Sequence, residues 1–198
     1  MSAERASRVG AWQARVVAAR TPTKAELAGA YGAVIPDLVR EDLRVLLVGI
    51  NPGLWSGWSG LHFGRPANRL WLTLYESGLT DRRLRPEQTD ELLRAGIGVT
   101  NLVNRATARA DELGDEEIRA GVPRLIATVE RWRPRSVAVL GISAYRVAFR
   151  RTKAVIGPQP EDLAGVPLWV LPNPSGLNAH YQQPALSEEY AKLAAAVR

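Results

Sequence analysis

Two asparagine–proline dipeptides carry the chemistry that this sequence could perform. The first begins at Asn51 and follows the apolar run LRVLLVGI at residues 43–50, and the second begins at Asn173 and follows PLWVLP at residues 167–172. An asparagine amide does not titrate, but its oxygen can hold a water molecule and its nitrogen can donate hydrogen bonds. Such residues suit a reaction whose leaving group departs early, so that the attacking water needs only to be placed.

The sequence lacks the residues that several other kinds of enzyme chemistry require. The chain has no cysteine, which excludes disulfides, thiolate nucleophiles and cysteine-bound zinc or iron–sulfur clusters. Its two histidines, His62 and His180, do not have the spacing of a zinc motif, and we expect no metal and no cofactor. There is no phosphate-binding P-loop and no dinucleotide fingerprint. Ser175 and His180 could belong to a hydrolase triad, but the GxSxG elbow is missing.

Composition limits the class of protein. With 198 residues, of which 46% are hydrophobic, the chain can form one domain with a real core. The net charge of +6 favours a polyanionic partner, although the Arg-rich composition of a GC-rich genome explains it equally well. No apolar run approaches the roughly 20 residues that span a bilayer, and the N-terminus lacks the apolar segment of a signal peptide. We therefore expect a cytoplasmic bacterial protein without a membrane partner.

The apolar runs predict an α/β fold. Residues 43–50, 136–142 and 167–172 are continuously apolar, as strands buried on both faces are, and residues 98–103 form a shorter candidate strand. Helical patterns lie before and between them, at residues 24–31, 67–77, 87–94, 113–131, 143–150 and 186–197. Alternating strands and helices predict a mostly parallel sheet. Because ligands bind at the carboxyl ends of such strands, both Asn-Pro turns should lie at the functional edge.

Two further segments differ from this pattern. Residues 1–41 are predicted to be a helical N-terminal extension that precedes a domain of residues 42–198. The segment at 54–66 is rich in glycine and tryptophan and is predicted to be a loop.

Five motifs resemble those of a known family. They are GINPG at 49–53, Phe63, PANRLW at 66–71, GVTNLV at 98–103 and NPSGL at 173–177. In this order and spacing the chain resembles, from about residue 42 onward, the mismatch-specific uracil-DNA glycosylases, the group that includes thymine-DNA glycosylase. The resemblance implies a three-layer sandwich with a central mostly parallel sheet. It also implies a monomeric, monofunctional base-excision repair enzyme that hydrolyses the N-glycosidic bond of uracil mispaired with guanine in double-stranded DNA, and of related bases such as thymine or ethenocytosine, leaving an abasic site.

The resemblance also implies roles for residues of the first motifs. Asn51 would position the attacking water, and Phe63 would stack on the flipped base. Their alternatives are an Asx-type turn for Asn51 and core packing for Phe63. The remaining residues expected at the base pocket are Ile50, Gly53, Asn68 and Asn101. The family often has lysine at the position of Asn101.

The last motif would contact the duplex. Leu177 would fill the gap left by the extruded nucleotide, because inserted apolar side chains offset the cost of unstacking. Gly176 and Asn178 would meet the orphaned guanine, and Ser175 would hold phosphates. The family often has serine at the position of Asn178.

Further roles depend on alternatives that the sequence leaves open. Asp90 is a candidate second activator of the water, although its place near a predicted helix start also suits a capping residue. A basic group at residues 146–153 is either a second DNA contact or a solvated helix face. The alternative function is a non-catalytic protein that binds mismatches or damage on the same fold. A small-molecule hydrolase that uses Ser175 is a weaker alternative.

Overall fold

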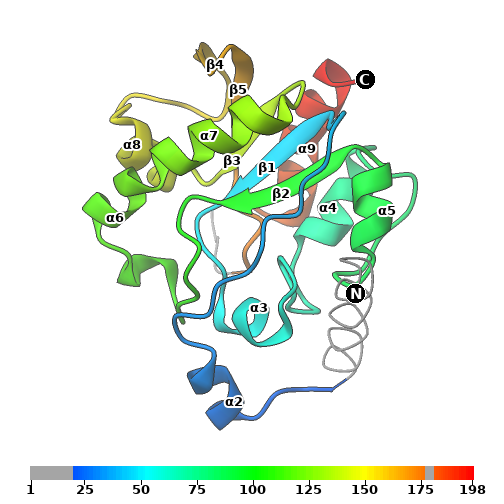
Figure 1. The fold of residues 1–198 in the computed structure, drawn as a ribbon. Helices are drawn as coiled ribbons and strands as arrows, with labels where there is room; N and C mark the ends of the chain where they lie inside the picture. Colours follow the sequence, from blue (N-terminus) through cyan, green and yellow to red (C-terminus); the bar gives the residue numbers. More distant parts are fainter. Residues whose placement is uncertain (1–19, 177–180) are drawn as a thin grey trace, which may run out of the picture.

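The computed structural model describes residues 20–176 and 181–198. A five-stranded sheet forms its centre, in the order β2-β1-β3-β5-β4 (Figure 1). The strands β2 (Ile97–Asn101), β1 (Val45–Gly49), β3 (Val137–Leu140) and β5 (Val166–Leu171) are mutually parallel. Every residue of β1, β2 and β3 is buried; β1 and β3 contain no polar side chain, whereas β2 ends in the buried polar residues Thr100 and Asn101. The predicted α/β class with a mostly parallel sheet is confirmed.

The edge strand β4 (Gly157–Leu163) is the one whose sequence did not indicate a strand. It pairs antiparallel with β5 and contains Pro158 and Pro160. Proline removes a donor from the hydrogen-bond ladder and is tolerated at a sheet edge, where one side of the strand needs no partner. The polar residues between its buried ends therefore follow from its edge position.

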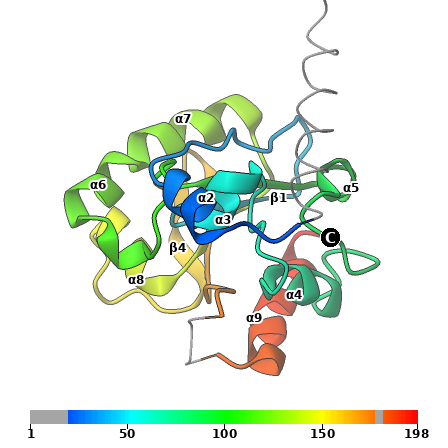
Figure 2. The same cartoon turned by 90° about the horizontal axis from the view of Figure 1, so that it is seen from below.

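Helices cover both faces of the sheet (Figure 2). The helices α4 (Leu70–Glu76), α5 (Thr89–Arg94) and α9 (Gln183–Ala196) pack on one face, and α6 (Asp115–Ala120), α7 (Val122–Trp132) and α8 (Ile142–Phe149) pack on the other. Side chains of β1 alternate between the two cores, with Val45 and Leu47 in the first and Leu46 and Val48 in the second. This alternation explains why β1 has no polar position.

The predicted helix at 113–131 is divided into α6 and α7 at Gly121. A Cβ atom on Gly121 would lie 2.0 Å from the carbonyl oxygen of Leu102, so only glycine fits this close approach. Pro123 lies in the first turn of α7, where its missing N–H costs no helical hydrogen bond. A short 3-10 helix, η1 (Ala110–Glu112), precedes α6.

The segment at 54–66 begins with a helix, which corrects its prediction as a loop. The helix α3 (Leu54–Ser59) ends at Gly60, whose φ of 70° is left-handed. A Cβ atom on Gly57 would lie 2.7 Å from the Cβ atom of Ala106 and 3.0 Å from the carbonyl oxygen of Ala30. Glycine thus lets α3 pack closely against its neighbours, a reason that lies outside the local sequence.

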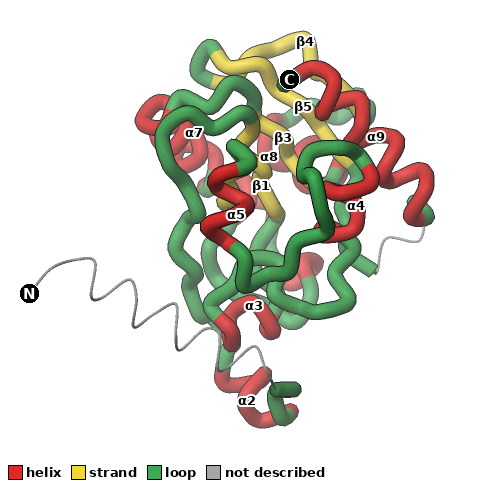
Figure 3. The backbone as a smooth tube through the Cα atoms, turned by 90° about the vertical axis from the view of Figure 1, so that its right-hand side faces the viewer, coloured by secondary structure: helices red, strands yellow, loops and turns green. Residues whose placement is uncertain are grey.

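The segment before β1 lies along the edge of the domain. It contains α2 (Lys24–Gly29), which a capping box of Thr23 and Glu26 begins, and α2 lies beside α3 (Figure 3). Leu38 then forms an antiparallel bridge with Val99 of β2. These contacts tie the end of the predicted extension to the sheet, while the boundary at residue 41 stays a prediction. No helix in the described ranges is long and apolar enough to cross a membrane.

Candidate active site

A cavity of about 930 Å³ opens at the carboxyl ends of β1 and β2. It brings together residues from the turn after β1, the loop after α3, the end of β2 and the turn after β5. The predicted site residues that line it are Ile50, Asn51, Gly53, Phe63, Asn68, Asn101, Ser175 and Gly176. The predicted wedge Leu177 and its neighbour Asn178 lie outside the described residues.

Asn51 uses its amide nitrogen to bind the loop that follows β2. Its Nδ2 atom donates to the carbonyl oxygen of Arg105 at 3.1 Å and to Oγ1 of Thr107 at 2.7 Å. The hydroxyl of Thr107 donates its own proton to the carbonyl oxygen of Arg109 at 2.7 Å, so that Oγ1 can only accept from Asn51. Both partners are therefore acceptors, which fixes the nitrogen toward them and leaves Oδ1 for the cavity.

The loop that holds Asn51 is itself anchored. The N–H of Thr107 donates to the carbonyl oxygen of Pro52 at 3.1 Å, and that of Ala106 donates to the carbonyl oxygen of Ala33 at 2.8 Å. The guanidinium of Arg105 pairs with Glu117 through two hydrogen bonds and lowers the pKa of that carboxyl. The amide of Asn51 is thus positioned by residues more than 50 positions away in the sequence.

His62 and Asn101 are buried side by side at the cavity. Nε2 of His62 donates to the carbonyl oxygen of Pro36 at 2.9 Å, and Nδ1 lies 3.4 Å from Nδ2 of Asn101. Burial lowers the pKa of His62 from its ordinary value of 6.5, while the Pro36 hydrogen bond and the charge of Asp37 oppose this shift. The ring is consequently neutral at neutral pH.

Phe63 is held in a left-handed backbone conformation beside these residues, with a φ of 49°. Its carbonyl oxygen accepts from Nε1 of Trp71 at 3.1 Å, and the N–H of Gly64 donates to Oγ of Ser56 at 3.1 Å. Such a conformation is costly for a residue with a side chain and persists only where neighbours impose it. The half-buried ring also packs against the core, so packing and exposure to the cavity coexist.

Arg69 connects the PANRLW motif with the second Asn-Pro turn. Its guanidinium donates to the carbonyl oxygens of Pro174 at 3.3 Å, Ser175 at 2.5 Å and Tyr181 at 2.6 Å. The hydroxyl of Tyr190 on α9 donates to the carbonyl oxygen of Pro172 at 3.1 Å. The turn that precedes residue 177 is therefore held by Arg69, which immediately precedes α4, and by Tyr190 of α9.

No carboxylate is among the described residues that line this cavity; its titratable side chains are His62, Arg65 and Arg109. Likewise, no group of three or more potential metal ligands occurs in the described parts of the chain. Among the described lining residues, the amides of Asn51, Asn68 and Asn101 are neutral groups that can orient a water molecule.

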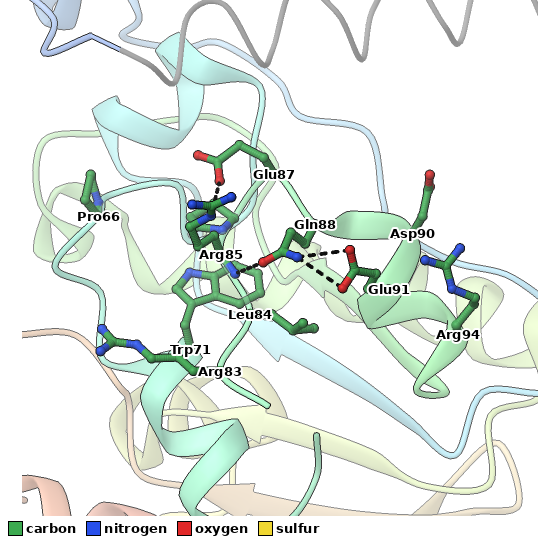
Figure 4. A pocket seen from close by; sticks show the side chains of 11 residues that line it. Pro66, Trp71, Arg83, Leu84, Arg85, Glu87, Gln88, Asp90, Glu91 and Arg94 are labelled. Atoms are coloured by element: carbon green, nitrogen blue, oxygen red, sulfur yellow. Dashed lines mark hydrogen bonds and ion pairs between the residues drawn. The ribbon is translucent and has the colours of Figure 1, made fainter. Parts of the chain in front are cut away.

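Asp90, the predicted second water activator, is not brought into this cavity. It is exposed in the first turn of α5 and lines a separate groove of about 970 Å³ (Figure 4). There a carboxylate interacts favourably with the N-terminal end of the helix dipole. Three arginines and three acids line this groove: Arg83, Arg85, Arg94, Glu87, Asp90 and Glu91. Its geometry supports a structural role for Asp90 and gives it no access to Asn51.

Three residues that shape the site were not predicted from the sequence: His62, Arg69 and Thr107. Arg69 lies inside a recognised motif, so its position was a usable signal. Nothing in the sequence connects Thr107 with Asn51, because their contact depends on β1 and β2 being neighbours.

The comparison with known families agrees with this geometry. A model of the Uracil DNA glycosylase superfamily matches residues 36–197, and the chain belongs to that superfamily. Membership implies a glycosylase that hydrolyses N-glycosyl bonds in DNA during base-excision repair. The match begins a few residues before the position at which the motif resemblance begins, and it includes the segment that contacts β2.

The fold is similar to that of a solved relative. The solution NMR structure of a protein from Methanosarcina acetivorans, named a "putative Uracil DNA glycosylase", has a TM-score of 0.57 to this chain at 20% sequence identity. The similarity covers 82% of this chain and 96% of that one. At this identity, the likeness shows a shared uracil-DNA-glycosylase-like fold.

Proposed function

We propose that this protein is a monofunctional, mismatch-specific uracil-DNA glycosylase that acts as a monomer on double-stranded DNA without a cofactor. It would release uracil, and related bases such as thymine or ethenocytosine, from pairs with guanine and leave an abasic site. The observation that carries this proposal is the Asn51 amide, whose nitrogen is held by two acceptors and whose oxygen is left for a cavity without a described carboxylate.

Water placement is the chemical task of Asn51 in this proposal. Its Oδ1 atom accepts one hydrogen of a water molecule and points the water's lone pair at the sugar carbon from which the base departs. An amide cannot remove the proton, so the base must leave first, as an anion stabilised by backbone donors of the pocket. The sugar then becomes oxocarbenium-like, and a neutral water captures it: the water oxygen bonds to the sugar carbon, and the proton that it loses passes to the departed base anion, so that the products are the abasic sugar and the neutral base.

The turn at 51–53 also supports a site for more than uracil alone. Gly53 follows Pro52, and a Cβ atom placed on Gly53 would have no neighbour within 4 Å. A small residue beside open space leaves room for a substituent on the base, such as the methyl group of thymine. Phe63 supplies an aromatic face on which a base of either size can stack.

Asn101 supports recognition of the base edge. Its Oδ1 atom lies above Gly49, since a Cβ atom on Gly49 would be 2.5 Å from it and 3.5 Å from Cζ of Phe63. An acceptor beside the stacking ring suits a base that has an N–H group at ring position 3, which uracil and thymine share. We therefore assign Asn101 to contact with that edge.

The duplex contacts follow from the second turn. Ser175 and Gly176 line the cavity at its lip, and Arg69 fixes the backbone there. We propose that Ser175 holds a phosphate, that Leu177 fills the vacancy in the helix, and that Gly176 and Asn178 meet the unpaired guanine.

A panel of duplexes tests the proposal. Matched oligonucleotides would carry G·U, G·T, G·ethenocytosine or A·U at one position, and alkali would cleave the strand at any abasic site formed. We expect release from the guanine pairs, fastest from G·U, with strand breakage only after alkali. Uracil that stays in place in G·U although the duplex is bound would instead identify a non-catalytic mismatch binder.

A further inference from the structure

The contact between His62 and Asn101 determines whether the oxygen or the nitrogen of the Asn101 amide faces the cavity. The carbonyl oxygen of Pro36, 2.9 Å from Nε2 of His62, can only accept, so Nε2 carries the hydrogen. In a neutral ring Nδ1 then has a lone pair. The Asn101 amide must turn its nitrogen toward that lone pair, 3.4 Å away, and its oxygen elsewhere.

We propose that His62 is a positioning residue that locks the Asn101 oxygen toward the base, and that protonation of His62 inverts the amide and weakens selection against bases without an N–H at position 3. This inference rests on the proposed function. It assigns to a residue outside the motifs a control over which base the site accepts.

The inversion follows from hydrogen-bond chemistry. A protonated imidazole donates from both nitrogens, so Nδ1–H would require an acceptor from Asn101. The amide would then present its NH2 group to the cavity. That group matches a base whose ring position 3 is an acceptor or lacks hydrogen, as in cytosine and its N3-bridged adducts, and it clashes with the N–H of uracil.

The surroundings of His62 keep the neutral form dominant at neutral pH. Burial lowers its pKa, and Asp37 is the charged group that acts against this shift. Asp37 is itself paired with Arg124 of α7 at 2.9 Å, which reduces its influence on the ring. The other charged side chains at the same cavity, Arg65 and Arg109, are exposed. The amide should therefore invert only in acidic solution, below the ordinary histidine range.

Two variants of His62 separate its possible roles. Glutamine in His62→Gln can donate to the Pro36 oxygen and accept from Asn101 but cannot titrate, whereas leucine in His62→Leu can do neither. The measurement is the ratio of single-turnover excision rates on G·U and G·ethenocytosine duplexes at pH 7.5 and pH 5. A ratio cancels pH effects that both substrates share, and His62→Gln reports any pH effect that belongs to the bases.

We expect the wild-type ratio to fall about tenfold at the lower pH, the size of one misplaced hydrogen bond. In His62→Gln the ratio should stay high at both values, and in His62→Leu it should be low at both. A wild-type ratio that changes no more than that of His62→Gln, or a high ratio in His62→Leu, would overturn the inference. Thermal unfolding of each variant checks that it is folded, and the comparison of wild type with His62→Gln stands without the leucine variant.

A second measurement does not depend on enzyme activity. Nitrogen NMR of the wild-type protein distinguishes the ring tautomers, and the chain has only two histidines, so that His62→Gln assigns the signal. A neutral ring with hydrogen on Nε2 at pH 7.5 is expected, and hydrogen on Nδ1 would contradict the inference. Absence of uracil release by the wild-type protein would refute the proposed function while leaving this test intact.

Discussion

The two Asn-Pro turns occupy equivalent places in the sheet but use their asparagines differently. Asn173 accepts a hydrogen bond from the N–H of Ser175 at 2.9 Å, within its own turn. Asn51 donates instead to Arg105 and Thr107, on the loop that follows a neighbouring strand. Both asparagines line the same cavity, but this contact of Asn173 stays within its own turn, whereas Asn51 is positioned by a loop that is distant in the sequence.

This difference has its cause in the neighbours of each strand. β1 lies between β2 and β3, so the loop after β2 meets the turn after β1. The turn after β5 is bound instead by Arg69 and Tyr190 through its carbonyl oxygens. The two Asn-Pro turns therefore differ in which groups hold them, because the order of the strands places a different segment beside each turn.

Removal of each asparagine amide in turn should give the largest difference in excision rate between the two turns. We expect Asn51→Ala to slow uracil release about a hundredfold or more, because loss of one positioning group misplaces the attacking water. The matched variant Asn173→Ala should change the single-turnover rate only a few-fold. Rates on a G·U duplex and DNA affinity measured separately would decide this, and equal rate losses in the two variants would contradict distinct roles.

A methyl group on Gly49 tests the space beside the first turn. Gly49 precedes Asn51 by two residues, whereas Leu171 holds the corresponding place before Asn173. A Cβ atom on Gly49 would lie 2.5 Å from Oδ1 of Asn101, so that the amide must shift. We expect Gly49→Ala to lower the excision rate by one to two orders of magnitude, since overpacking costs about 1–3 kcal/mol.

The matched control is Leu171→Ala, which removes packing in the core below the second turn. We expect Leu171→Ala to lower the melting temperature, while the excision rate measured below that temperature stays close to the wild-type rate. A Gly49→Ala protein with wild-type activity would show that the Asn101 oxygen is not needed where the structure places it.

Thr107 provides a gentler change to the first turn. Thr107→Val removes an acceptor of the Asn51 amide and also the donor to Arg109, while the side-chain shape is kept. We expect a loss of about tenfold in the single-turnover rate with DNA affinity retained, and near-complete recovery in Thr107→Ser. If valine and serine behaved alike, the Asn51 amide would not depend on this hydroxyl.

The smallest expected effect is the contribution of His62 to the pH dependence of the free energy of unfolding. Burial holds the pKa of native His62 below its ordinary value of 6.5, so the unfolded chain binds the proton first as the pH falls. The free energy of unfolding should therefore decrease below about pH 6.5 relative to His62→Gln, and the difference should be constant above it. Urea unfolding of both proteins across this pH range measures the difference in the free energy of unfolding. A wild-type protein that became more stable relative to His62→Gln as the pH fell would contradict a buried neutral ring.

The sequence predicted elements well where burial dictates residue type. The apolar runs around β1, β3 and β5 required strands buried on both faces, and the motifs predicted which residues line the cavity. The predictions failed where distant contacts decide. The helix α3 packs closely against Ala30 and Ala106 through Gly57, and Asp90 on α5 lines a groove separate from the cavity that contains Asn51.

By itself the sequence determined a parallel α/β sheet with two asparagine turns at one edge, because strands without a solvent face are mostly apolar and parallel strands end together. Only the tertiary structure decided which amide atom each asparagine turns toward the cavity. A side-chain amide has no orientation of its own; acceptors supplied by residues far away in the chain, such as Thr107 for Asn51 and His62 for Asn101, impose one.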